Sequence, residues 1–372
     1  MRIAVDATPA VVQRGGVGRY TRELLRVLVQ ETLDHKFILS VAAGDADTDE
    51  LLRQLPPGAW REARRLPASE RIMTAIWHRA RLPVSVERWI GSHAVYHGTD
   101  FTLPPTRAAG VVTIHDLSFL LHPEYSHPEL ARYLQNVVPR SVARADAVIT
   151  VSASVAAEVA SAYPDARRKI VAIPNGVAHP ASPVAREAAS RPTILMVGTV
   201  EPRKNHLAVI QAMTGVRAGH PDARLLVVGR RGWRDDEIMN EIKRGQAEGW
   251  LTWIEDASDD DLEAAYGQAT LFVSASHYEG FGLPLLEAMT RGLPCVASEI
   301  TAHREVATDS VAYVDSSKSE SIAARITGLL DDAEARDRLA DAGRTHAERY
   351  SWHETARRTL RVYESAASGE SR

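Results

Sequence analysis

Short apolar segments alternate with helical patterns along most of the chain. In the first half, residues 2–6 form an apolar strand-like run, and residues 20–31 follow with apolar side chains at helical spacing. Further strand-like runs occupy residues 36–42, 94–96, 110–115, 147–152 and 170–173. Strands that alternate with helices are typical of βαβ units on a mainly parallel sheet. The first half is therefore predicted to be a Rossmann-like α/β domain.

A second series of the same units starts after a break in the pattern. The break begins at Pro174-Asn175-Gly176 and continues through residues 177–192, which are rich in Ala and Ser and contain three Pro. Such a composition is typical of a linker. Strand-like runs return at residues 193–197, 224–228, 251–254, 270–274, 294–298 and 311–314. We expect a first domain over 1–176, a linker over 177–192, a second Rossmann-like domain over 193–350 and a final helix and tail over 351–372.

Length and composition agree with two globular domains. The 372 residues exceed the size at which one hydrophobic core stops growing, and the 45% hydrophobic and 25% charged fractions are average for globular chains. A net charge of -4 lacks the basic excess of nucleic-acid-binding proteins. No apolar run approaches the roughly 20 residues that span a bilayer, and no signal-peptide pattern follows Met1. We therefore expect a cytoplasmic protein that does not bind nucleic acid.

The most informative stretch is residues 279–287, with the sequence EGFGLPLLE. It follows an apolar run that predicts a buried strand, and it opens an apolar helical pattern. A strand that enters a Gly-rich turn and then a helix presents free backbone N–H groups, which can hold a phosphate. Glu279 and Glu287 bracket the turn and could reach one ligand from two sides. A simpler explanation is that a Glu in the first turns of a helix is favoured by the helix dipole alone.

A second loop with phosphate-binding chemistry follows the first strand of the second half. Residues 198–205, GTVEPRKN, place Arg203 and Lys204 beside the start of a helix. Arg supplies a planar fork and Lys a point charge, so the pair could clamp a diphosphate. The alternative is a solvated basic turn. Gly198 and the position after the first strand favour phosphate binding.

The first half carries two weaker candidates. Residues 14–20, RGGVGRY, open the first helix, where backbone can approach an anion closely, although the third glycine of a dinucleotide fingerprint is missing. Glycine for turn geometry alone is the alternative. His115 and Asp116 end a buried strand at the ligand-facing edge of the predicted sheet. Asp116 could fix the tautomer of His115 or cap the next element.

Several other patterns have mainly structural explanations. Asp45-Ala46-Asp47 matches a metal-binding D-x-D pattern, but in an acidic loop such a match is mostly chance. Trp233, beside Arg230 and Arg231, could stack on a base or pack in the core. Residues 61–90 mix Arg with apolar side chains in a pattern that suits an amphipathic helix on an anionic membrane, although a solvated face with core anchors is favoured. The single cysteine, Cys295, is expected to be a buried thiol.

In their order along the chain, these motifs resemble those of the retaining glycosyltransferases of family 4. The resemblance rests on residues 15–18, on His115-Asp116, on residues 201–205 and on the E-x7-E pair Glu279 and Glu287. It covers nearly the whole chain, and it implies the α/β GT-B architecture: two facing Rossmann-like domains, a deep interdomain cleft and a last helix that crosses back to the first domain. The pattern alone leaves the destination of that helix open.

The resemblance also implies roles for individual residues. Arg203 and Lys204 would bind the diphosphate of a nucleotide sugar, Glu279 would hydrogen-bond the transferred sugar, and Glu287 would bind the ribose. His115 would reach the sugar from the first domain, and Gly16 would approach the diphosphate. Further implied donor-binding positions are Gly198, Trp253, Ile254, Phe281, Gly282 and Leu283. Where many members of the family have a Gly after the strand at 251–254, this chain has Glu255-Asp256, which leaves the shape of the base pocket open.

The implied reaction is transfer of a hexose with retention and without a metal or other cofactor. Within the family, residues 198–205 and 229–233 resemble bacterial mannosyltransferases that use GDP-mannose to build surface polysaccharide. The expected partners are therefore GDP-mannose and a glycan or lipid-linked acceptor, with possible peripheral contact at the inner membrane face. The alternatives are a UDP-sugar transferase, a 2-epimerase, or a protein that binds a nucleotide sugar without turnover.

Overall fold

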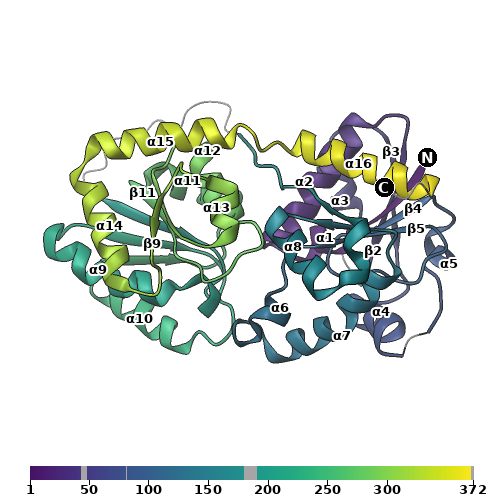
Figure 1. Ribbon diagram of the computed structural model, residues 1–372, viewed down its shortest axis with the longest axis horizontal. Helices are drawn as coiled ribbons and strands as arrows, with labels where there is room; N and C mark the ends of the chain where they lie inside the picture. Colours follow the sequence, from purple (N-terminus) through teal and green to yellow (C-terminus); the bar gives the residue numbers. More distant parts are fainter. Residues whose placement is uncertain (43–47, 81, 180–190, 370–372) are drawn as a thin grey trace. The chain divides into compact units, whose positions relative to one another are not determined.

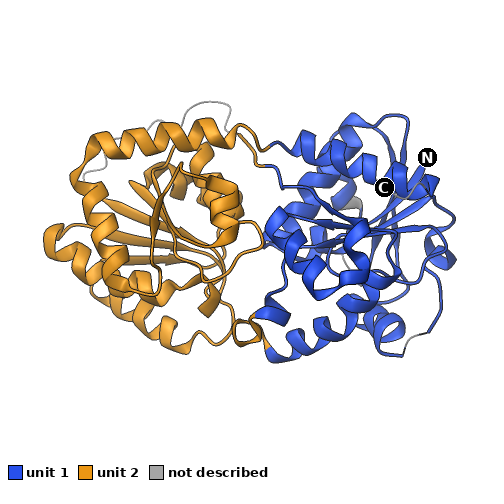
Figure 2. Ribbon diagram, viewed as in Figure 1, with its two compact units in different colours: residues 1–121, 128–176, 351–372 blue, residues 122–127, 177–350 orange. Residues whose placement is uncertain are grey.

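The chain folds into two compact α/β units. The computed structural model describes residues 1–42, 48–80, 82–179 and 191–369. One unit comprises residues 1–121, 128–176 and 351–372, and the other comprises residues 122–127 and 177–350 (Figures 1 and 2). The tract 180–190 of the predicted linker lies outside the described residues.

The first unit is built on a seven-stranded parallel sheet in the order β3-β2-β1-β4-β5-β6-β7. Its strands are β1 (Arg2–Asp6), β2 (Lys36–Val41), β3 (Trp60–Arg65), β4 (Val95–Gly98), β5 (Ala109–Ile114), β6 (Ala147–Thr150) and β7 (Ile170–Ala172). Its helices are α1 (Thr8–Val12), α2 (Gly16–Glu31), α3 (Thr48–Gln54), α4 (Glu70–Thr74), the π-helical turn η1 (Ala75–Arg79), α5 (Glu87–Ile90), α6 (Ser118–Leu121), α7 (Pro128–Arg144), α8 (Ala153–Ala162), the 3-10 turn η3 (Pro164–Lys169) and α16 (Trp352–Ser368). The central strands β1, β4 and β5 are almost fully buried, as a sheet with helices on both faces requires.

The second unit repeats this architecture on a six-stranded parallel sheet in the order β10-β9-β8-β11-β12-β13. Its strands are β8 (Thr193–Val197), β9 (Arg224–Val228), β10 (Leu251–Ile254), β11 (Leu271–Ser274), β12 (Cys295–Ser298) and β13 (Ala312–Val314). Its helices are the 3-10 turns η2 (Pro123–Tyr125) and η4 (Pro202–Lys204), then α9 (His206–Gly219), α10 (Asp236–Ala247), α11 (Asp259–Gln268), α12 (Leu283–Thr290), α13 (Thr301–Ala307), α14 (Ser319–Asp331) and α15 (Ala333–Ala347). Cys295 is a buried free thiol in β12.

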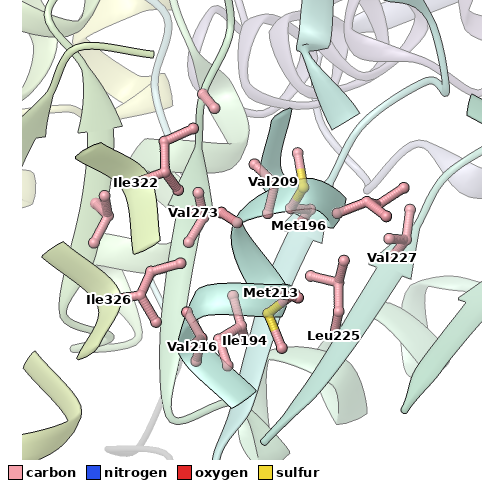
Figure 3. Close-up of a cluster of buried hydrophobic side chains, with 14 of the residues drawn as sticks. Ile194, Met196, Val209, Met213, Val216, Leu225, Val227, Val273, Ile322 and Ile326 are labelled. Carbon is pink, nitrogen blue, oxygen red and sulfur yellow. The ribbon is translucent and has the colours of Figure 1, made fainter. Parts of the chain in front are cut away.

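A contiguous hydrophobic core holds the second unit together. Side chains of β8, β9 and β11 pack against one face of α9 and against α14 (Figure 3). Met213 on α9 and Ile326 on α14 are fully buried there. Burial of one such side chain contributes about 1.5–3 kcal/mol, so this core fixes the strand ends that carry the candidate site.

The last helix belongs to the first unit, as the resemblance implies. The hydroxyl of Tyr363 on α16 lies 2.6 Å from Nδ1 of His97, which is fully buried on β4. Near the start of α16, Thr355 donates to the backbone oxygen of Pro174. Gly176 passes so close to Trp352 that a Cβ on Gly176 would lie 2.1 Å from the Trp352 nitrogen. The end of the first series of strands and the final helix are therefore packed as one piece.

The residues 61–90 do not form one amphipathic helix. They contain most of β3, then α4, η1 and α5 as separate short elements. Met73 and Trp77 are buried core anchors, whereas Ile72 is 52% exposed. Pro67 and Pro83 fall between the elements, where a missing N–H costs least. Across the part of the chain that the structure describes, no helix is both long and apolar enough to cross a membrane.

Residues 122–127 are the one segment of the first half that belongs to the second unit, which the sequence did not predict. The Tyr125 ring stacks on His277 with centroids 5.5 Å apart, and His122 contacts the ring of Tyr278. Trp233 donates from its indole nitrogen to the backbone oxygen of Tyr125 at 2.7 Å. Trp233 therefore packs and hydrogen-bonds within the protein. Of the two explanations for Trp233, packing rather than stacking on a base is the observed one.

Candidate active site

The site lies where the strand order of the second sheet reverses. From β8 the chain moves outward to β9 and β10 on one side, and then returns to β11 beside β8 and continues to β12 and β13 on the other. The loops that follow β8 and β11 therefore leave the sheet in opposite directions. In open α/β sheets, ligands bind in the crevice at the carboxyl ends of such strands. Both predicted phosphate-binding stretches follow these two strands.

The loop after β8 is held in an unusual backbone conformation. Gly198 has a φ of +148°, and a Cβ there would contact the Lys204 side chain at 3.4 Å. At the end of η4, Asn205 adopts the left-handed conformation with a φ of +58°. Its side-chain nitrogen donates to the backbone oxygens of Ala275 and Ser316 at 3.1 and 2.8 Å. These bonds fix the Arg203-Lys204 turn against the end of β11.

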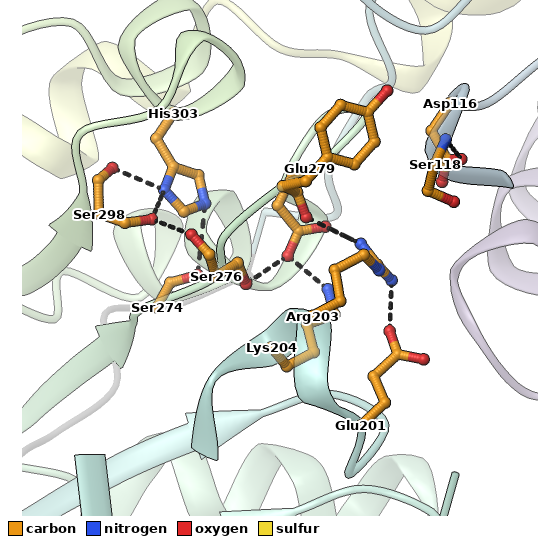
Figure 4. A network of polar contacts seen from close by, with 11 residues as sticks. Asp116, Ser118, Glu201, Arg203, Lys204, Ser274, Ser276, Glu279, Ser298 and His303 are labelled. Carbon is orange, nitrogen blue, oxygen red and sulfur yellow. Dashed lines mark hydrogen bonds and ion pairs between the residues drawn. The ribbon is translucent and has the colours of Figure 1, made fainter. Parts of the chain in front are cut away.

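Arg203, Lys204 and Glu279 meet in one ionic cluster (Figure 4). Nζ of Lys204 lies 2.5 Å from Oε1 of Glu279, and Nη1 of Arg203 lies 3.0 Å from Oε2 of the same carboxylate. Arg203 also pairs with Glu201 at 2.6 Å and donates to the backbone oxygen of Tyr278 at 3.0 Å. The structure thus joins the predicted diphosphate clamp to the predicted sugar-binding carboxylate. No motif in the sequence indicated this direct pairing.

The two carboxylates of the cluster have opposite pKa shifts. Burial alone would raise the pKa of Glu279, but the charges of Lys204 and Arg203 hold it well below the ordinary Glu value. Glu201 is 1% exposed, and burial raises its pKa despite the opposing charges of Arg203 and Lys204. Glu279 is therefore an acceptor of hydrogen bonds at neutral pH, as a group that holds sugar hydroxyls must be.

The turn after β11 has the geometry that its sequence predicts. Gly282 is the N-cap of α12 and has a φ of +97°, a conformation that favours glycine. Phe281 is buried and packs edge-on against Tyr350, and Leu283 begins the helix half-buried. Glu287 is 6% exposed and accepts a hydrogen bond from the Tyr266 hydroxyl at 2.9 Å. Tyr266 on α11 is a neighbour of Glu287 that no local motif indicated.

The candidate base-binding strand, β10, ends beside the loop after β9, and Gly229 of that loop adjoins Gly198. Trp253 on β10 is half-buried, and its indole nitrogen donates to the backbone oxygen of Gly229 at 2.8 Å. Ile254 is also half-buried, whereas Glu255 and Asp256 are exposed. The Trp253 ring is thus fixed against the β9 loop.

His115 in the first unit is a buried, oriented imidazole. Its Nε2 lies 2.8 Å from the backbone oxygen of Thr99, and its ring contacts the Tyr20 and Phe101 rings edge-on. Because a carbonyl oxygen only accepts, Nε2 carries the hydrogen, and burial lowers the pKa of the ring. Asp116 instead accepts from the backbone nitrogen of Ser118. Of the two explanations for Asp116, capping of the next element is the observed one, and Thr99 fixes the His115 tautomer.

In the glycine loop, Gly18 rather than Gly16 is required by packing. A Cβ on Gly18 would lie 1.8 Å from the backbone oxygen of Gln13, whereas a Cβ on Gly16 would meet no atom within 4 Å. Gly16 is exposed at the start of α2, where backbone N–H groups remain free to bind an anion. Its predicted approach to a diphosphate stays a prediction.

No metal centre emerges from the described residues, among which no three His, Cys, Asp or Glu side chains are grouped to hold an ion. Asp45 and Asp47 lie outside the described residues. Sequence reasoning also missed His303, Ser276 and Ser298, of which Ser276 bonds to Glu279 while Ser298 and His303 lie beyond Ser276 (Figure 4). Ser276 shares a turn with Glu279, but Ser298 and His303 reach that turn from 22 or more residues further along the chain, so their proximity leaves no local pattern in the sequence.

Comparison with known proteins supports a transferase of sugars. Residues 14–179 match the family Glycosyltransferase Family 4, and residues 181–346 match Glycosyl transferases group 1. The chain is 29% identical to O-antigen chain mannosyltransferase B of Escherichia coli, with coverage of 98% of this chain and 99% of that protein. It is 32% identical to phosphatidyl-myo-inositol mannosyltransferase of Mycobacterium leprae over 54% of this chain and 55% of that protein.

Solved structures share the fold at lower identity. Sucrose-phosphate synthase from Thermosynechococcus elongatus superposes with a TM-score of 0.75 at 18% identity over the full length of both chains. HepE from Anabaena, in complex with UDP and glucose, has a TM-score of 0.71 at 17% identity, with coverage of 98% of this chain and 99% of that one. These likenesses identify the fold as GT-B. Since the two family matches together span most of the sequence, the chain belongs to the glycosyltransferases, with a family 4 region in its first half and a group 1 region in its second.

Proposed function

We propose that the protein is a retaining, metal-independent hexosyltransferase that moves mannose from GDP-mannose to a glycan or lipid-linked acceptor. The observation that carries the proposal is the buried cluster of Arg203, Lys204 and Glu279 at the strand-order reversal of the second sheet. The choice of mannose draws on the O-antigen mannosyltransferase that resembles this chain over nearly its full length.

Arg203 and Lys204 would bind the diphosphate of the donor. Negative charge grows on the diphosphate as the bond to the sugar breaks, so fixed cations stabilise the transition state more than the ground state. Glu279 holds both cations in place before the donor arrives, and neither side chain is more than 17% exposed. Pre-organisation of this kind avoids the cost of reorientation during the reaction. Gly198 and the free N–H groups around Gly282 at the start of α12 would complete the anion site.

Glu279 and Glu287 would hold the two sugars of the donor. An ionised Glu279 accepts hydrogen bonds from hydroxyls of the transferred hexose, and Glu287, held by Tyr266, accepts from the ribose. Trp253 and Ile254 would border the base, and Phe281 and Leu283 would meet the sugar and diphosphate through their backbone. In the first unit, His115 would contact the hexose and Gly16 the diphosphate.

Retention of configuration follows if the acceptor hydroxyl attacks on the face from which the diphosphate leaves. A diphosphate oxygen then takes the proton of the hydroxyl, the new glycosidic bond forms, and the bond from sugar to diphosphate breaks. No covalent enzyme intermediate and no metal ion are needed in this scheme, because Arg203 and Lys204 supply the positive charge.

A panel of GDP- and UDP-sugars tests the proposed donor. Purified protein is incubated with each sugar nucleotide, with and without a mannan-type acceptor, and release of nucleoside diphosphate is measured. We expect GDP-mannose to be consumed fastest and the product to retain the α configuration by NMR. Consumption of a UDP-sugar alone would overturn the donor assignment, and conversion of the sugar without transfer would indicate an epimerase. Tight binding with no turnover of any donor would indicate a binding protein.

A further inference from the structure

A fully buried histidine lies behind Glu279, on the side away from the two cations (Figure 4). His303 is on α13, and its ring packs against the turn that starts α12: a Cβ on Gly282 would lie 3.3 Å from its Cδ2 and 3.6 Å from its Nε2. An apolar side chain would fill this space at a lower desolvation cost. The polar ring therefore needs an explanation from its contacts.

Ser298 fixes the tautomer of His303. Nδ1 of the ring lies 3.0 Å from the backbone oxygen and 3.1 Å from Oγ of Ser298. Because the carbonyl oxygen can only accept, Nδ1 carries the hydrogen. Burial lowers the pKa of His303, so the ring is neutral and Nε2 is an acceptor, with Ser274 Oγ at 3.3 Å.

Two serines continue the network from His303 to Glu279. Since Ser298 Oγ accepts from Nδ1, its own hydrogen is directed to the backbone oxygen of Ser276 at 2.6 Å. Ser276 Oγ in turn donates to Oε1 of Glu279 at 2.6 Å. Ser276 and Ser298 are both almost fully buried, so neither bond competes with bulk water. Ser298 therefore anchors the segment between β11 and the Gly282 turn, which carries Ser276 and Glu279.

We propose that His303 is a positioning residue that, through Ser298 and Ser276, sets the direction of the Glu279 carboxylate toward the transferred sugar. Lys204 and Arg203 bind the two oxygens of that carboxylate, and Ser276 donates a further hydrogen bond to the oxygen that Lys204 binds, Oε1. The inference rests on the proposed role of Glu279 in holding the hexose. It adds a requirement that no sequence motif contains, because Ser298 and His303 come from β12 and α13, whereas Ser276 and Glu279 lie in the turn before α12.

The test compares three variants with the wild type. His303→Leu keeps the volume but removes both nitrogens, and His303→Asn keeps a donor near the position of Nδ1. Ser298→Ala removes the link to Ser276 without change at Gly282. Turnover of the nucleotide sugar is measured together with the affinity for the nucleoside diphosphate, which has no hexose for Glu279 to hold.

We expect His303→Leu and Ser298→Ala to lower kcat roughly tenfold or more, as small misplacements of binding groups do. Affinity for the nucleoside diphosphate should stay within about twofold, and His303→Asn should recover most of the lost activity. The inference would be overturned if His303→Leu kept the wild-type kcat. It would also be overturned if affinity for the nucleoside diphosphate fell as much as turnover of the nucleotide sugar, or if His303→Asn recovered no activity.

Glu279→Gln separates failure of this inference from failure of the proposed function. If Glu279→Gln keeps wild-type turnover, the role of Glu279 itself is wrong. If no donor is turned over even by the wild type, urea unfolding decides: the midpoint shifts of His303→Leu and Glu279→Gln should not add in the double variant, because residues of one hydrogen-bond network are coupled. Additive shifts would remove the proposed link.

Discussion

At the scale of single residues, the charges of Lys204 and Arg203 stabilise the ionised form of the Glu279 carboxyl. Its folded-state pKa lies below the ordinary value of 4.5, so between the two values the unfolded chain binds more protons than the folded one. The ion pairs with Lys204 and Arg203 therefore stabilise the fold above about pH 4.5, and this contribution is lost as the pH falls below that value. Glu201, with its raised pKa, has the opposite dependence.

Glu279→Gln should remove this pH-dependent contribution. At pH 7 the variant should be about 3 kcal/mol less stable than the wild type, the lower end of the range for breaking a buried ion pair. The difference should shrink below about pH 4.5, where the unfolded wild-type chain becomes protonated. Urea unfolding followed by tryptophan fluorescence from pH 7 to pH 3 measures both quantities. A difference that stays constant over this range would contradict the assigned charge of Glu279.

The residues of the candidate site were predictable only where they share a local motif. Arg203 and Lys204 stand in one turn, and Glu279 precedes a glycine turn, so each was identified from its neighbours in the sequence. Glu201 was part of the first motif, but its pairing with Arg203 depends on the folded loop. Tyr266 and His303 approach from other helices, and nothing in their own surroundings in the sequence marks them.

At the scale of elements, α2 depends on Gly18 in its own first turn. Gly18→Ala should destabilise the protein by at least 2 kcal/mol, because its Cβ would lie 1.8 Å from the Gln13 oxygen and force the backbone to move. Gly16→Ala is the matched control: it has open space around the Cβ and should change stability by less than about 1 kcal/mol. Thermal unfolding of both variants measures the contrast. Equal destabilisation would show that the loop is not packed as described.

Strands were predictable from sequence where they are buried on both faces. The runs at β1, β8 and β9 are apolar at all their central positions, and the predicted bounds agree with the observed ones. β3 was missed because it is an edge strand, paired only with β2, and its sequence WREARR is mostly polar. The placement of residues 122–127 in the second unit was also missed, since it depends on ring contacts with His277 and Tyr278 that are distant in sequence.

At the scale of the whole molecule, the final helix returns the chain to the first unit. The Tyr363 hydroxyl and His97 form its buried polar contact with β4, and burial lowers the pKa of His97 to about 3, so the ring stays neutral. In the same helix, Thr359 is fully buried, and its hydroxyl has no hydrogen-bond partner among the described residues. Removal of the hydroxyl should therefore have opposite effects on the stability of the protein at Tyr363 and at Thr359.

Tyr363→Phe should destabilise the protein by about 1–2 kcal/mol, because a buried nitrogen of His97 loses its partner. Thr359→Val, of nearly the same shape, should be neutral or stabilising by up to about 1 kcal/mol, because it removes an unpaired buried hydroxyl. Hydrogen exchange and urea unfolding measure the stability of the two variants relative to the wild type. A loss of stability in Thr359→Val as large as that in Tyr363→Phe would contradict the contacts described for α16.

In the proposed reaction, Arg203 and Lys204 stabilise the negative charge of the departing diphosphate, and kcat/KM of Lys204→Ala for GDP-mannose measures this contribution. Removal of one well-placed transition-state donor typically costs about 100-fold or more in rate, so a loss of that size is expected. Circular dichroism and the unfolding midpoint of the variant show whether the fold is kept. A folded Lys204→Ala protein with wild-type kcat/KM would show that Lys204 does not stabilise the departing diphosphate.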